Sequence, residues 1–402
     1  MASGLYDIIT VGGGLGGSAL AKVMAEHSAR VLVLERERQF KDRVRGEQMH
    51  PWGVAEAKKL GIYDLLRDTC GHELPYWNTY QGSALTGRRD ITATTPQHAP
   101  EFAFYHPAMQ EVLLSAAADA GAEVRRGATV REVKPGAMPT VVIEWEGRVE
   151  ELRARLVVGA DGRASLVRKW AGFTVHHDPP RLLIAGVLFD EMPAVPQDAS
   201  CVVLNPDLGQ AVPLFPQGGG RVRAYFVYLK EAQYRLQGEA DIPRFIAESV
   251  KTGAPAEFYA GAKVCGPLAI FDAADAWVEH PYRQGVALVG DAAASNDPSY
   301  GEGLSLTVRG VRVLRDSLLG HEDWDTAGHA YAEEYDRFYG AIHTVTSWYT
   351  DIFYERGPAA EARRARALPL IAQDGSRVPD HIFSGPDLPL DESVRRRFFG
   401  EE

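Results

Sequence analysis

The stretch Ile8–Gly17, which reads IITVGGGLGG, decides the fold, because an apolar strand runs directly into a glycine-rich turn. Residues 18–26 follow with the Ala and Leu content of a helix. Gly12, Gly14 and Gly17 have the G-x-G-x-x-G spacing. In that spacing the first glycine permits the turn, the second lets backbone approach a pyrophosphate, and the third lets the helix pack on the strand. The stretch predicts that phosphate oxygens bind at the positive N-terminus of this helix.

Glu35 ends the second apolar strand, residues 31–34, and completes a βαβ unit of the usual ~30 residues. A carboxylate at this position accepts hydrogen bonds from an adenosine ribose and repels a 2′-phosphate. The unit therefore favours FAD or NAD over NADP as the bound dinucleotide.

Two later stretches repeat the pattern of an apolar strand that ends in glycine and an acidic residue. They are Leu156–Gly162 (LVVGADG) and Val286–Asp291 (VALVGD), and the second leads to Pro298 and to Gly301-Glu302-Gly303. Each stretch alone is a weak signal, whereas the three in this order predict three walls of one flavin site.

Composition and charge bound the class of protein. A chain of 402 residues, 45% apolar and 24% charged, is long enough for two domains with a substantial core. The net charge of −11 disfavours nucleic acid or an acidic membrane surface as a partner. The sequence has no apolar run of the ~18 residues of a membrane span, and its first strand begins too early, at Tyr6, for a signal peptide. We therefore expect a cytoplasmic protein, with its oligomeric state left open.

Cysteine and histidine spacing argues against a metal site. Cys70, Cys201 and Cys265 are widely spaced and form no Cys-x-x-Cys pair, so neither a disulfide framework nor a zinc site is indicated. His176-His177-Asp178 is the one run that resembles a ligand set, but adjacent side chains of an extended segment diverge. We expect no metal.

The order of elements predicts an α/β fold with an α+β insertion. Helical spacing marks residues 54–66, 107–120, 303–319 and 324–354, and a β-meander is expected over 124–158. Strand-like runs punctuated by Pro and Gly indicate a second, antiparallel sheet. The expected division is a nucleotide domain of residues 1–73, 102–180 and 270–356, a substrate domain of residues 74–101 and 181–269, and a C-terminal tail of residues 357–402.

Over about residues 5–350 the chain resembles the class A FAD-dependent monooxygenases, the p-hydroxybenzoate hydroxylase-like family. The resemblance is carried by the glycine turn with Glu35, the Asp-Gly motif at Asp161 and Gly162, the Gly-Asp motif at Gly290 and Asp291, and the segment from Pro298 to Gly303. It implies a Rossmann-like FAD-binding domain with an inserted, mostly antiparallel β-sheet domain for the substrate, and C-terminal helices.

By this resemblance Asp291 would bind the ribityl chain of FAD, and Asp161 and Gly162 would border FAD and a passing nicotinamide nucleotide. Pro298 would line the face that reacts with oxygen. The helix opened by Gly303 would stabilise the negative charge of the reduced flavin. The expected cofactor contacts are Gly12, Gly14, Leu15, Gly16, Gly17, Glu35, Arg36, Arg45, His106, Asp161, Gly162, Gly290, Asp291, Pro298, Gly301, Gly303 and Leu304, and the expected catalytic positions are Arg45, Pro298, Gly301 and Gly303.

The substrate of such a protein lies between the inserted sheet and the flavin, so its contacts come from alternate positions of the strands. The expected contacts are Tyr80, Asn205, Val212, Leu214, Tyr225 and Tyr228, with Phe104 and Leu204 as further candidates. A mostly apolar, aromatic-lined pocket suits a planar aromatic or conjugated small molecule.

The resemblance implies that NADPH or NADH reduces FAD, that oxygen adds to give a flavin hydroperoxide, and that one oxygen hydroxylates or epoxidises the substrate. Three alternatives stay open. A reductase of the geranylgeranyl-reductase type is loosely supported by Arg45-Gly46-Glu47, and a flavin-dependent halogenase is opposed by the absence of a Trp-x-Trp-x-Ile-Pro sequence. The third is an FAD-carrying interaction protein without catalysis.

Three positions depart from the family pattern. Ala294 stands where histidine is common, Ser305 where the helix opening usually has asparagine, and His106 where arginine or glutamine is usual. In addition, Glu302 would oppose the anion-stabilising helix start unless its carboxylate is turned away or hydrogen-bonded. His50 lies in a segment that the resemblance brings near FAD.

Overall fold

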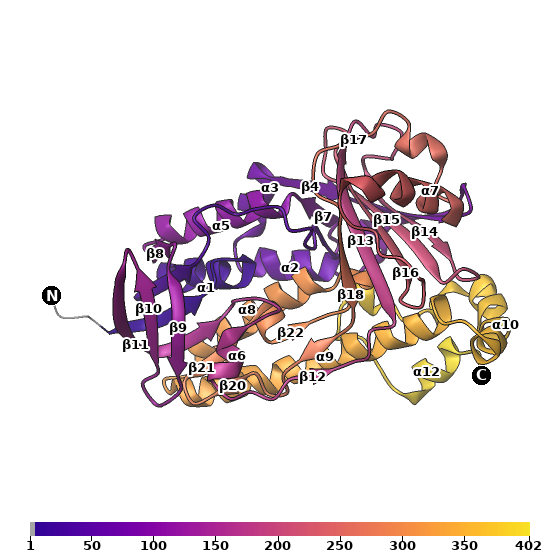
Figure 1. Cartoon of the computed structure of the whole chain (residues 1–402). Helices are drawn as coiled ribbons and strands as arrows, with labels where there is room; N and C mark the ends of the chain where they lie inside the picture. The colour runs from indigo at the N-terminus through magenta and orange to yellow at the C-terminus, as the bar shows by residue number, and fades with distance from the viewer. Residues whose placement is uncertain (1–4) are drawn as a thin grey trace.

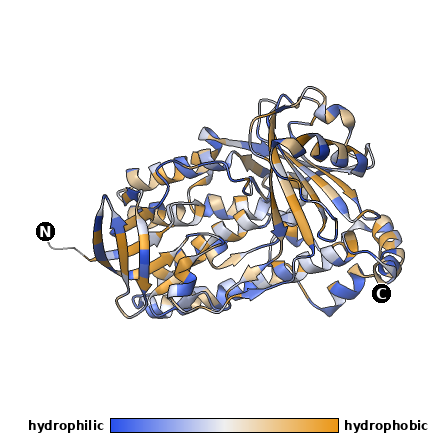
Figure 2. Ribbon diagram, viewed as in Figure 1, coloured by the Kyte–Doolittle hydropathy of each residue, from blue (hydrophilic) through white to orange (hydrophobic). Residues whose placement is uncertain are grey.

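The computed structural model describes residues 5–402 and confirms the α/β class. Two eight-stranded sheets lie at opposite ends of the molecule, and the long helix α9 (Trp324–Phe353) runs along the base from one to the other (Figure 1). Strands of both sheets are mostly hydrophobic, whereas the surface helices alternate between hydrophobic and hydrophilic residues (Figure 2).

The first sheet is built around β1 (Tyr6–Val11), which pairs in parallel with β2 (Val31–Glu35) and with β11 (Arg148–Gly159). β11 also pairs in parallel with β21 (Val286–Leu288), so the carboxyl ends of these strands meet at one edge, which is where ligands of such sheets bind. The remaining strands of this sheet are β8 (Glu123–Arg126), β9 (Thr129–Lys134), β10 (Thr140–Trp145) and β20 (Tyr282–Arg283).

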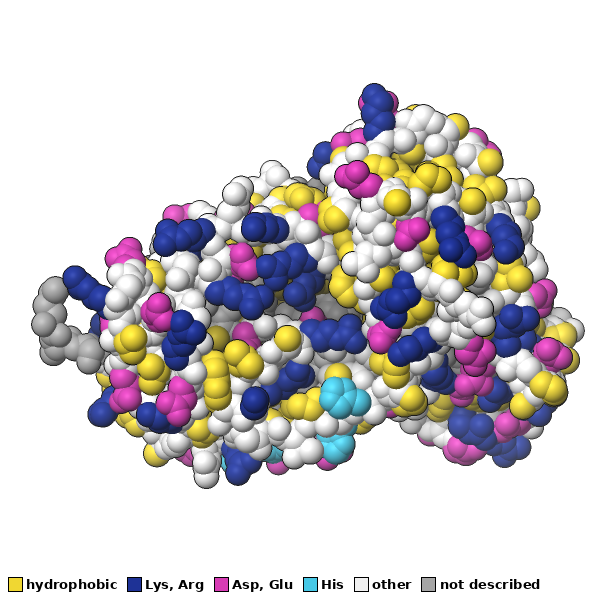
Figure 3. Space-filling view, in the orientation of Figure 1, with side chains coloured by type: hydrophobic (Ala, Val, Ile, Leu, Met, Phe, Trp, Pro, Cys, Tyr) yellow, Lys and Arg dark blue, Asp and Glu magenta, His cyan; other side chains and the backbone are white. Residues whose placement is uncertain are grey.

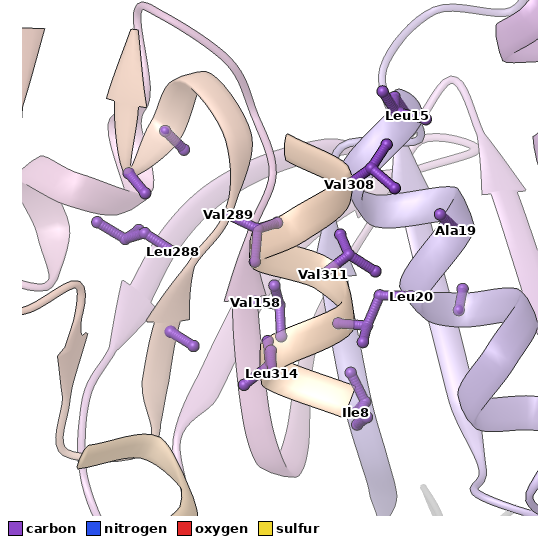
Figure 4. Close-up of a cluster of buried hydrophobic side chains, with 14 of the residues drawn as sticks. Ile8, Leu15, Ala19, Leu20, Val158, Leu288, Val289, Val308, Val311 and Leu314 are labelled. Carbon is purple, nitrogen blue, oxygen red and sulfur yellow. The ribbon is translucent and has the colours of Figure 1, made fainter. Parts of the chain in front are cut away.

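Two helices cover the parallel strands. α1 (Leu15–Glu26) and α8 (Gly303–Gly320) pack against each other, and α1 also packs against β1 and β2. Figure 4 shows the side chains of this core, which is apolar throughout, as expected for a parallel sheet buried on its face. Its labelled members are Ile8, Leu15, Ala19, Leu20, Val158, Leu288, Val289, Val308, Val311 and Leu314.

The second sheet is mostly antiparallel and has two different faces. One face packs on α7 (Ile242–Thr252) through Phe245 and Phe226. The other face is turned toward the first sheet, because Val44 and Tyr354 from that part pack on it. Its strands are β5 (Tyr76–Gln81), β6 (Ala84–Asp90), β13 (Leu182–Asp190), β14 (Ala199–Asn205), β15 (Gln210–Pro216), β16 (Val222–Leu229), β17 (Lys263–Val264) and β18 (Ala269–Ala273).

Short elements complete the chain. They are β3 (Gln48–Met49), β4 (Gly71–Leu74), β7 (Glu101–Phe104), β12 (His176–His177), β19 (Ala276–Trp277) and β22 (Ala294–Ser295), with helices α4 (Ile91–Thr94), α5 (His106–Asp119) and α6 (Leu166–Trp170) and 3-10 turns at Glu239–Asp241, Ala256–Tyr259, Gly290–Ala292, Pro298–Tyr300 and Gly375–Arg377. Within residues 5–402, none of the helices has both the length and the apolar character that crossing a bilayer requires.

The structure differs from the sequence-based expectation in two elements. The helix expected over residues 54–66 is two helices, α2 (Pro51–Lys59) and α3 (Tyr63–Thr69), because Gly61 adopts φ +67 and ends the first. The expected C-terminal tail is helical instead, with α10 (Pro358–Gln373), α11 (His381–Ser384) and α12 (Glu392–Phe398). This segment packs on α9 through an apolar cluster of Tyr349, Ile352, Phe398 and Phe399 that extends the core.

Candidate functional site

The three strand-glycine-acid stretches meet at one edge of the first sheet. Ala160, after β11, donates its N–H to the carbonyl of Val11 at 2.8 Å, and Val289, after β21, donates to Gly159 at 2.9 Å. The turns that follow the three strands are therefore neighbours. Figure 3 shows Lys and Arg side chains gathered about the hollow in the middle of this face of the molecule.

The glycine turn fits a dinucleotide. Gly12 has φ +107, and a Cβ atom there would lie 2.3 Å from the Ala160 carbonyl oxygen. A Cβ atom on Gly17 would lie 1.9 Å from the Gly12 oxygen, so these two glycines let strand and helix touch. Gly14 is different, because the nearest heavy atom to a Cβ there is Gln110 Nε2 at 3.6 Å. Among the described residues no side chain caps α1, so its first N–H groups are available to phosphate oxygens.

Glu35 lies directly beside this turn. Its Oε2 accepts from the Gly13 N–H at 2.7 Å and its Oε1 accepts from the Glu37 N–H at 2.8 Å. The carboxylate is 6% exposed, and each oxygen retains a lone pair for a ribose hydroxyl. Arg36, the next residue, is exposed.

Asp161 has a structural use. Its carboxylate accepts from Ser165 Oγ at 2.6 Å and from the backbone N–H groups of Leu166 and Val167 at 2.7 and 3.2 Å, so it caps α6. These bonds do not place the carboxylate on the cofactor. Gly162, at φ +79, is the part of the motif that borders the hollow, since the nearest atom to a Cβ there is Arg45 Nη1 at 3.9 Å.

Arg45 and Asp291 face each other. Arg45 Nη1 lies 3.4 Å from Asp291 Oδ2, and the two side chains are 42% and 34% exposed. The Arg45 carbonyl accepts from the Tyr225 hydroxyl at 2.8 Å, which joins this loop to the second sheet. His106 Nδ1 lies 2.8 Å from the Gly46 carbonyl oxygen, so His106 supports the same loop from the start of α5.

The turn before α8 brings Pro298, Gly301 and Gly303 to the same edge. Pro298 is exposed, and Gly301 has φ +74 with a Cβ position only 2.7 Å from Gln48 Oε1. A Cβ on Gly303 would have open space for 4 Å around it, and Leu304 Cγ lies 3.7 Å from the Cβ position of Gly46. The start of α8 is therefore open to a ligand on the Gly303 side.

Sequence reasoning missed a buried cluster behind this turn. Glu302 is 0% exposed, and its Oε2 accepts from Trp52 Nε1 at 3.2 Å. The carboxylate is therefore hydrogen-bonded, as expected for an acidic residue at the start of this helix. His50 Nδ1 lies 2.8 Å from Glu101 Oε1, and its Nε2 lies 2.8 Å from the Tyr300 carbonyl oxygen. Glu101 lies on a separate strand, so only the tertiary fold joins these groups, and no spacing in the sequence signals them.

The substrate side differs from the expectation. Tyr80, Val212, Leu214 and Tyr228 lie in the core between the second sheet and α7, and Asn205 donates to the Thr252 carbonyl at 3.1 Å on that same side. Phe104 lies in the core of the first part. Because alternate residues of a strand point to opposite faces, the five residues of the second sheet are turned away from the cofactor edge. The prediction for them is wrong.

Tyr225 and Leu204 lie on the face turned toward the first sheet. That face carries a set of half-buried side chains of which sequence reasoning named only Leu204, although counting in steps of two along β15 and β16 from Tyr225 points to this side. The set comprises Leu204, Phe215, Phe271, Tyr300 and Phe353, packed on buried Val44, Ile184, Tyr225 and Tyr354. We call these nine residues the aromatic face.

Asp178, which follows His176 and His177 in the sequence, is paired in the structure with a histidine from α9 instead. Its Oδ2 lies 2.7 Å from His343 Nε2, and one ligand atom each of Asp178, Asp275 and His343 fits within 4.8 Å. Asp275 already accepts from Asn296, Tyr339 and the Asp297 N–H. These hydrogen bonds account for the cluster, and the absence of a metal stays a prediction.

Comparison with known proteins agrees with this geometry. The profile of the FAD binding domain family matches residues 6–337. The rifampicin monooxygenase of Streptomyces venezuelae is 27% identical over 327 residues, which cover 81% of this chain and 66% of that protein. The digeranylgeranylglycerophospholipid reductase 2 of Methanopyrus kandleri is 27% identical over 344 residues, 82% of this chain and 81% of that protein. The crystal structure of p-nitrophenol 4-monooxygenase PnpA from Pseudomonas putida superposes with a TM-score of 0.79 at 20% identity, covering 94% of this chain and 96% of that one.

The fold and the glycine turn define a flavoprotein. The chain belongs to the FAD binding domain family, and FAD is its cofactor. This confirms the resemblance to the class A FAD-dependent monooxygenases and the Rossmann-like fold with an inserted sheet.

Proposed function

We propose that the protein is an FAD-dependent monooxygenase that uses NADPH or NADH and oxygen to hydroxylate or epoxidise an aromatic or conjugated small molecule. The aromatic face carries this proposal, because its half-buried rings adjoin the cofactor edge: the Tyr225 hydroxyl donates to the Arg45 carbonyl, and Tyr300 directly precedes Gly301. Rings of this kind bind a planar apolar molecule by stacking or edge contacts. The names of the rifampicin and p-nitrophenol monooxygenases agree with this substrate class.

FAD supplies the electron transfer and oxygen chemistry when bound. The residues of the chain position it: the free N–H groups of α1 bind the pyrophosphate, Glu35 the ribose and Asp291 the ribityl hydroxyls. The aromatic face excludes water from the reacting edge, which protects the oxidant from wasteful breakdown. We place the reaction in the cytoplasm, because the cysteines are free thiols, as expected in a reducing compartment.

The test is a substrate panel of phenols and polycyclic aromatics with the purified yellow protein. We expect at least one compound to speed flavin reduction by NADPH or NADH and to be recovered with one added oxygen atom. If no compound in the panel speeds reduction and none is oxygenated, the hydroxylase proposal is wrong for this substrate class.

A neighbouring pair in β18 tests the assignment of the aromatic face. Phe271 belongs to the aromatic face, whereas Ile270 packs on the opposite, α7-facing side. We expect Phe271→Ala to raise the KM or Kd of the oxygenated compound about 10-fold, since burying a large apolar side chain contributes about 1.5–3 kcal/mol. Ile270→Ala is the matched control and should leave binding unchanged. Equal effects of the two changes on binding would contradict the assignment.

A reductase of C=C bonds is the second candidate, because the archaeal phospholipid reductase matches the chain at the same identity as the rifampicin enzyme. Anaerobic incubation of the reduced protein with an isoprenoid separates the two. Saturation of a double bond without oxygen supports the reductase, and product formation that requires oxygen supports the monooxygenase.

A further inference from the structure

Three ionisable side chains form a closed cluster directly beneath the first turn of α8. His50, Glu101 and Glu302 are 1%, 0% and 0% exposed, and each comes from a different segment. His50 precedes α2, Glu101 begins β7 and Glu302 precedes α8. The cluster therefore lies next to the start of α8, between the expected cofactor contacts Gly301 and Gly303. Its three members are not themselves among the cofactor contacts expected from the family.

The groups around His50 favour its cationic form. Its Nδ1 faces a carboxylate oxygen of Glu101 and its Nε2 faces the carbonyl oxygen of Tyr300, both at 2.8 Å. Both of these partners are acceptors, which favours a proton on each ring nitrogen. Gln48 Nε2 lies 3.0 Å from Nδ1 and is a donor, whereas Gln48 Oε1 has no partner among the described residues, so a protonated Nδ1 requires the Gln48 amide to present its oxygen instead. Burial lowers the pKa of His50, but Glu302 and Glu101 outweigh burial and raise the pKa to about 9.

One cation thus faces two carboxylates. Glu101 is the nearer, and its second oxygen accepts from Ser200 Oγ. Glu302 Oε1 lies 3.8 Å from His50 Nε2 and has no hydrogen-bond partner within residues 5–402. A buried carboxylate whose nearest cation is already paired is the member of the cluster that gains a proton at the lowest cost. Burial raises the pKa of Glu302 to about 8, although His50 and Trp52 oppose the rise.

The groups that face this cluster from other elements are themselves paired. Arg89 of β6 binds Asp380 with two hydrogen bonds of 2.6 and 2.9 Å, and the Tyr349 hydroxyl of α9 donates to the Pro379 carbonyl at 2.6 Å. Burial raises the pKa of Tyr349, so it stays protonated throughout the range of interest. Below about pH 9, where His50 stays protonated, Glu302 is therefore the variable charge.

We propose that Glu302 takes up a proton from solvent when the flavin is reduced, so that the charge below the start of α8 becomes more positive as the flavin becomes more negative. Two electrons from the nicotinamide donor enter the flavin, one O–H bond forms at the Glu302 carboxylate, and His50 stays an imidazolium paired with Glu101. Glu302 acts as a positioning residue, because it works through the helix start and not by contact with the substrate. The proposal rests on FAD binding and not on the identity of the substrate.

The sign of the effect follows from the charges. An ionised Glu302 disfavours the reduced flavin, whereas a neutral carboxyl does not. The wild type and Glu302→Gln should therefore have the same flavin midpoint potential at low pH. Above about pH 8 the wild-type potential should fall below that of the variant. A tenfold shift in the proton equilibrium of Glu302 corresponds to about 30 mV for a two-electron couple.

The experiment is an anaerobic redox titration of the purified yellow holoprotein across this pH range, with Glu302→Gln and with Glu333→Gln as an exposed glutamate control on α9. Divergence of Glu302→Gln at high pH, with Glu333→Gln following the wild type, supports the proposal. Potentials that stay parallel at every pH overturn it. The titration contains neither oxygen nor substrate, so failure of the hydroxylase proposal does not affect its result.

A second measurement needs only the wild type, with His50→Gln to assign the signal. ¹⁵N NMR near neutral pH should show both ring nitrogens of His50 protonated. A neutral His50 ring would remove the cation on which the proposal depends and would overturn it. At about pH 8 to 9, proton uptake on reduction in weakly buffered solution should likewise exceed the uptake by the flavin alone, and equality of the two there would count against Glu302.

Discussion

Gly14→Val is expected to yield folded but colourless protein. Gly14 has φ −74 and ψ −168, which valine adopts readily, and the nearest atom to its Cβ position is 3.6 Å away. The fold therefore tolerates the side chain. The added methyl groups, however, occupy the approach of a pyrophosphate to the free N–H groups of α1. We expect loss of FAD with an unchanged circular dichroism spectrum.

Gly340→Val is the matched control, since a Cβ atom there also has open space and the residue lies on α9, outside the three motifs. It should remain yellow. Gly17→Ala provides the contrast, because its Cβ would lie 1.9 Å from the Gly12 oxygen and the βα unit itself should fail. Retention of FAD by Gly14→Val at wild-type affinity would refute the placement of the pyrophosphate.

Arg223→Met should have the largest effect on stability. Arg223 is 0% exposed, and its guanidinium binds Glu47 at 2.7 and 3.0 Å and Asp42 at 2.8 Å. The change leaves the buried Glu47 carboxylate without its cation, which costs about 3–5 kcal/mol in comparable cases. Glu47 also accepts from the His106 N–H at 2.9 Å, so the loop that carries Arg45 should loosen as well.

The measurement is the free energy of unfolding from denaturant titration, followed by FAD affinity. Arg221→Met, two residues earlier in the chain, is the control. The Arg221 side chain is 42% exposed and pairs with Asp190 at the surface. Such exposed pairs contribute only about 0–1 kcal/mol. Equal losses for the two variants would show that the buried network does not join the second sheet to the Arg45 loop.

The cofactor edge was predictable from sequence because its chemistry depends on local backbone. Gly12 and Gly17 must be glycine for steric reasons that act within one βαβ unit, and Glu35 follows at a fixed distance along the chain. The carboxyl ends of parallel strands then bring the later motifs to the same edge. The helices expected near residues 107–120, 303–319 and 324–354 correspond to α5, α8 and α9.

The substrate side was not predictable in the same way. Side chains alternate between the two faces of a strand, so the face of each residue is known only once the face of one residue in that strand is known. Tyr225 and Tyr228 are both tyrosines of β16, yet they lie on opposite faces. The buried cluster could not be predicted from the sequence at all, because only tertiary packing brings His50, Glu101 and Glu302 together. Asp161 shows a use that the family motif does not signal, because its carboxylate caps its own helix, and its expected contact with FAD stays a prediction.

The central claim is that the protein transfers oxygen from O₂ to a substrate bound at the aromatic face. The direct test is a turnover experiment under ¹⁸O₂ with the compound that best speeds flavin reduction, analysed by mass spectrometry. We expect one ¹⁸O atom per product molecule, and a lower yield of that product with Phe271→Ala than with Ile270→Ala. Hydrogen peroxide in full stoichiometry, with no ¹⁸O in any organic product, would contradict it.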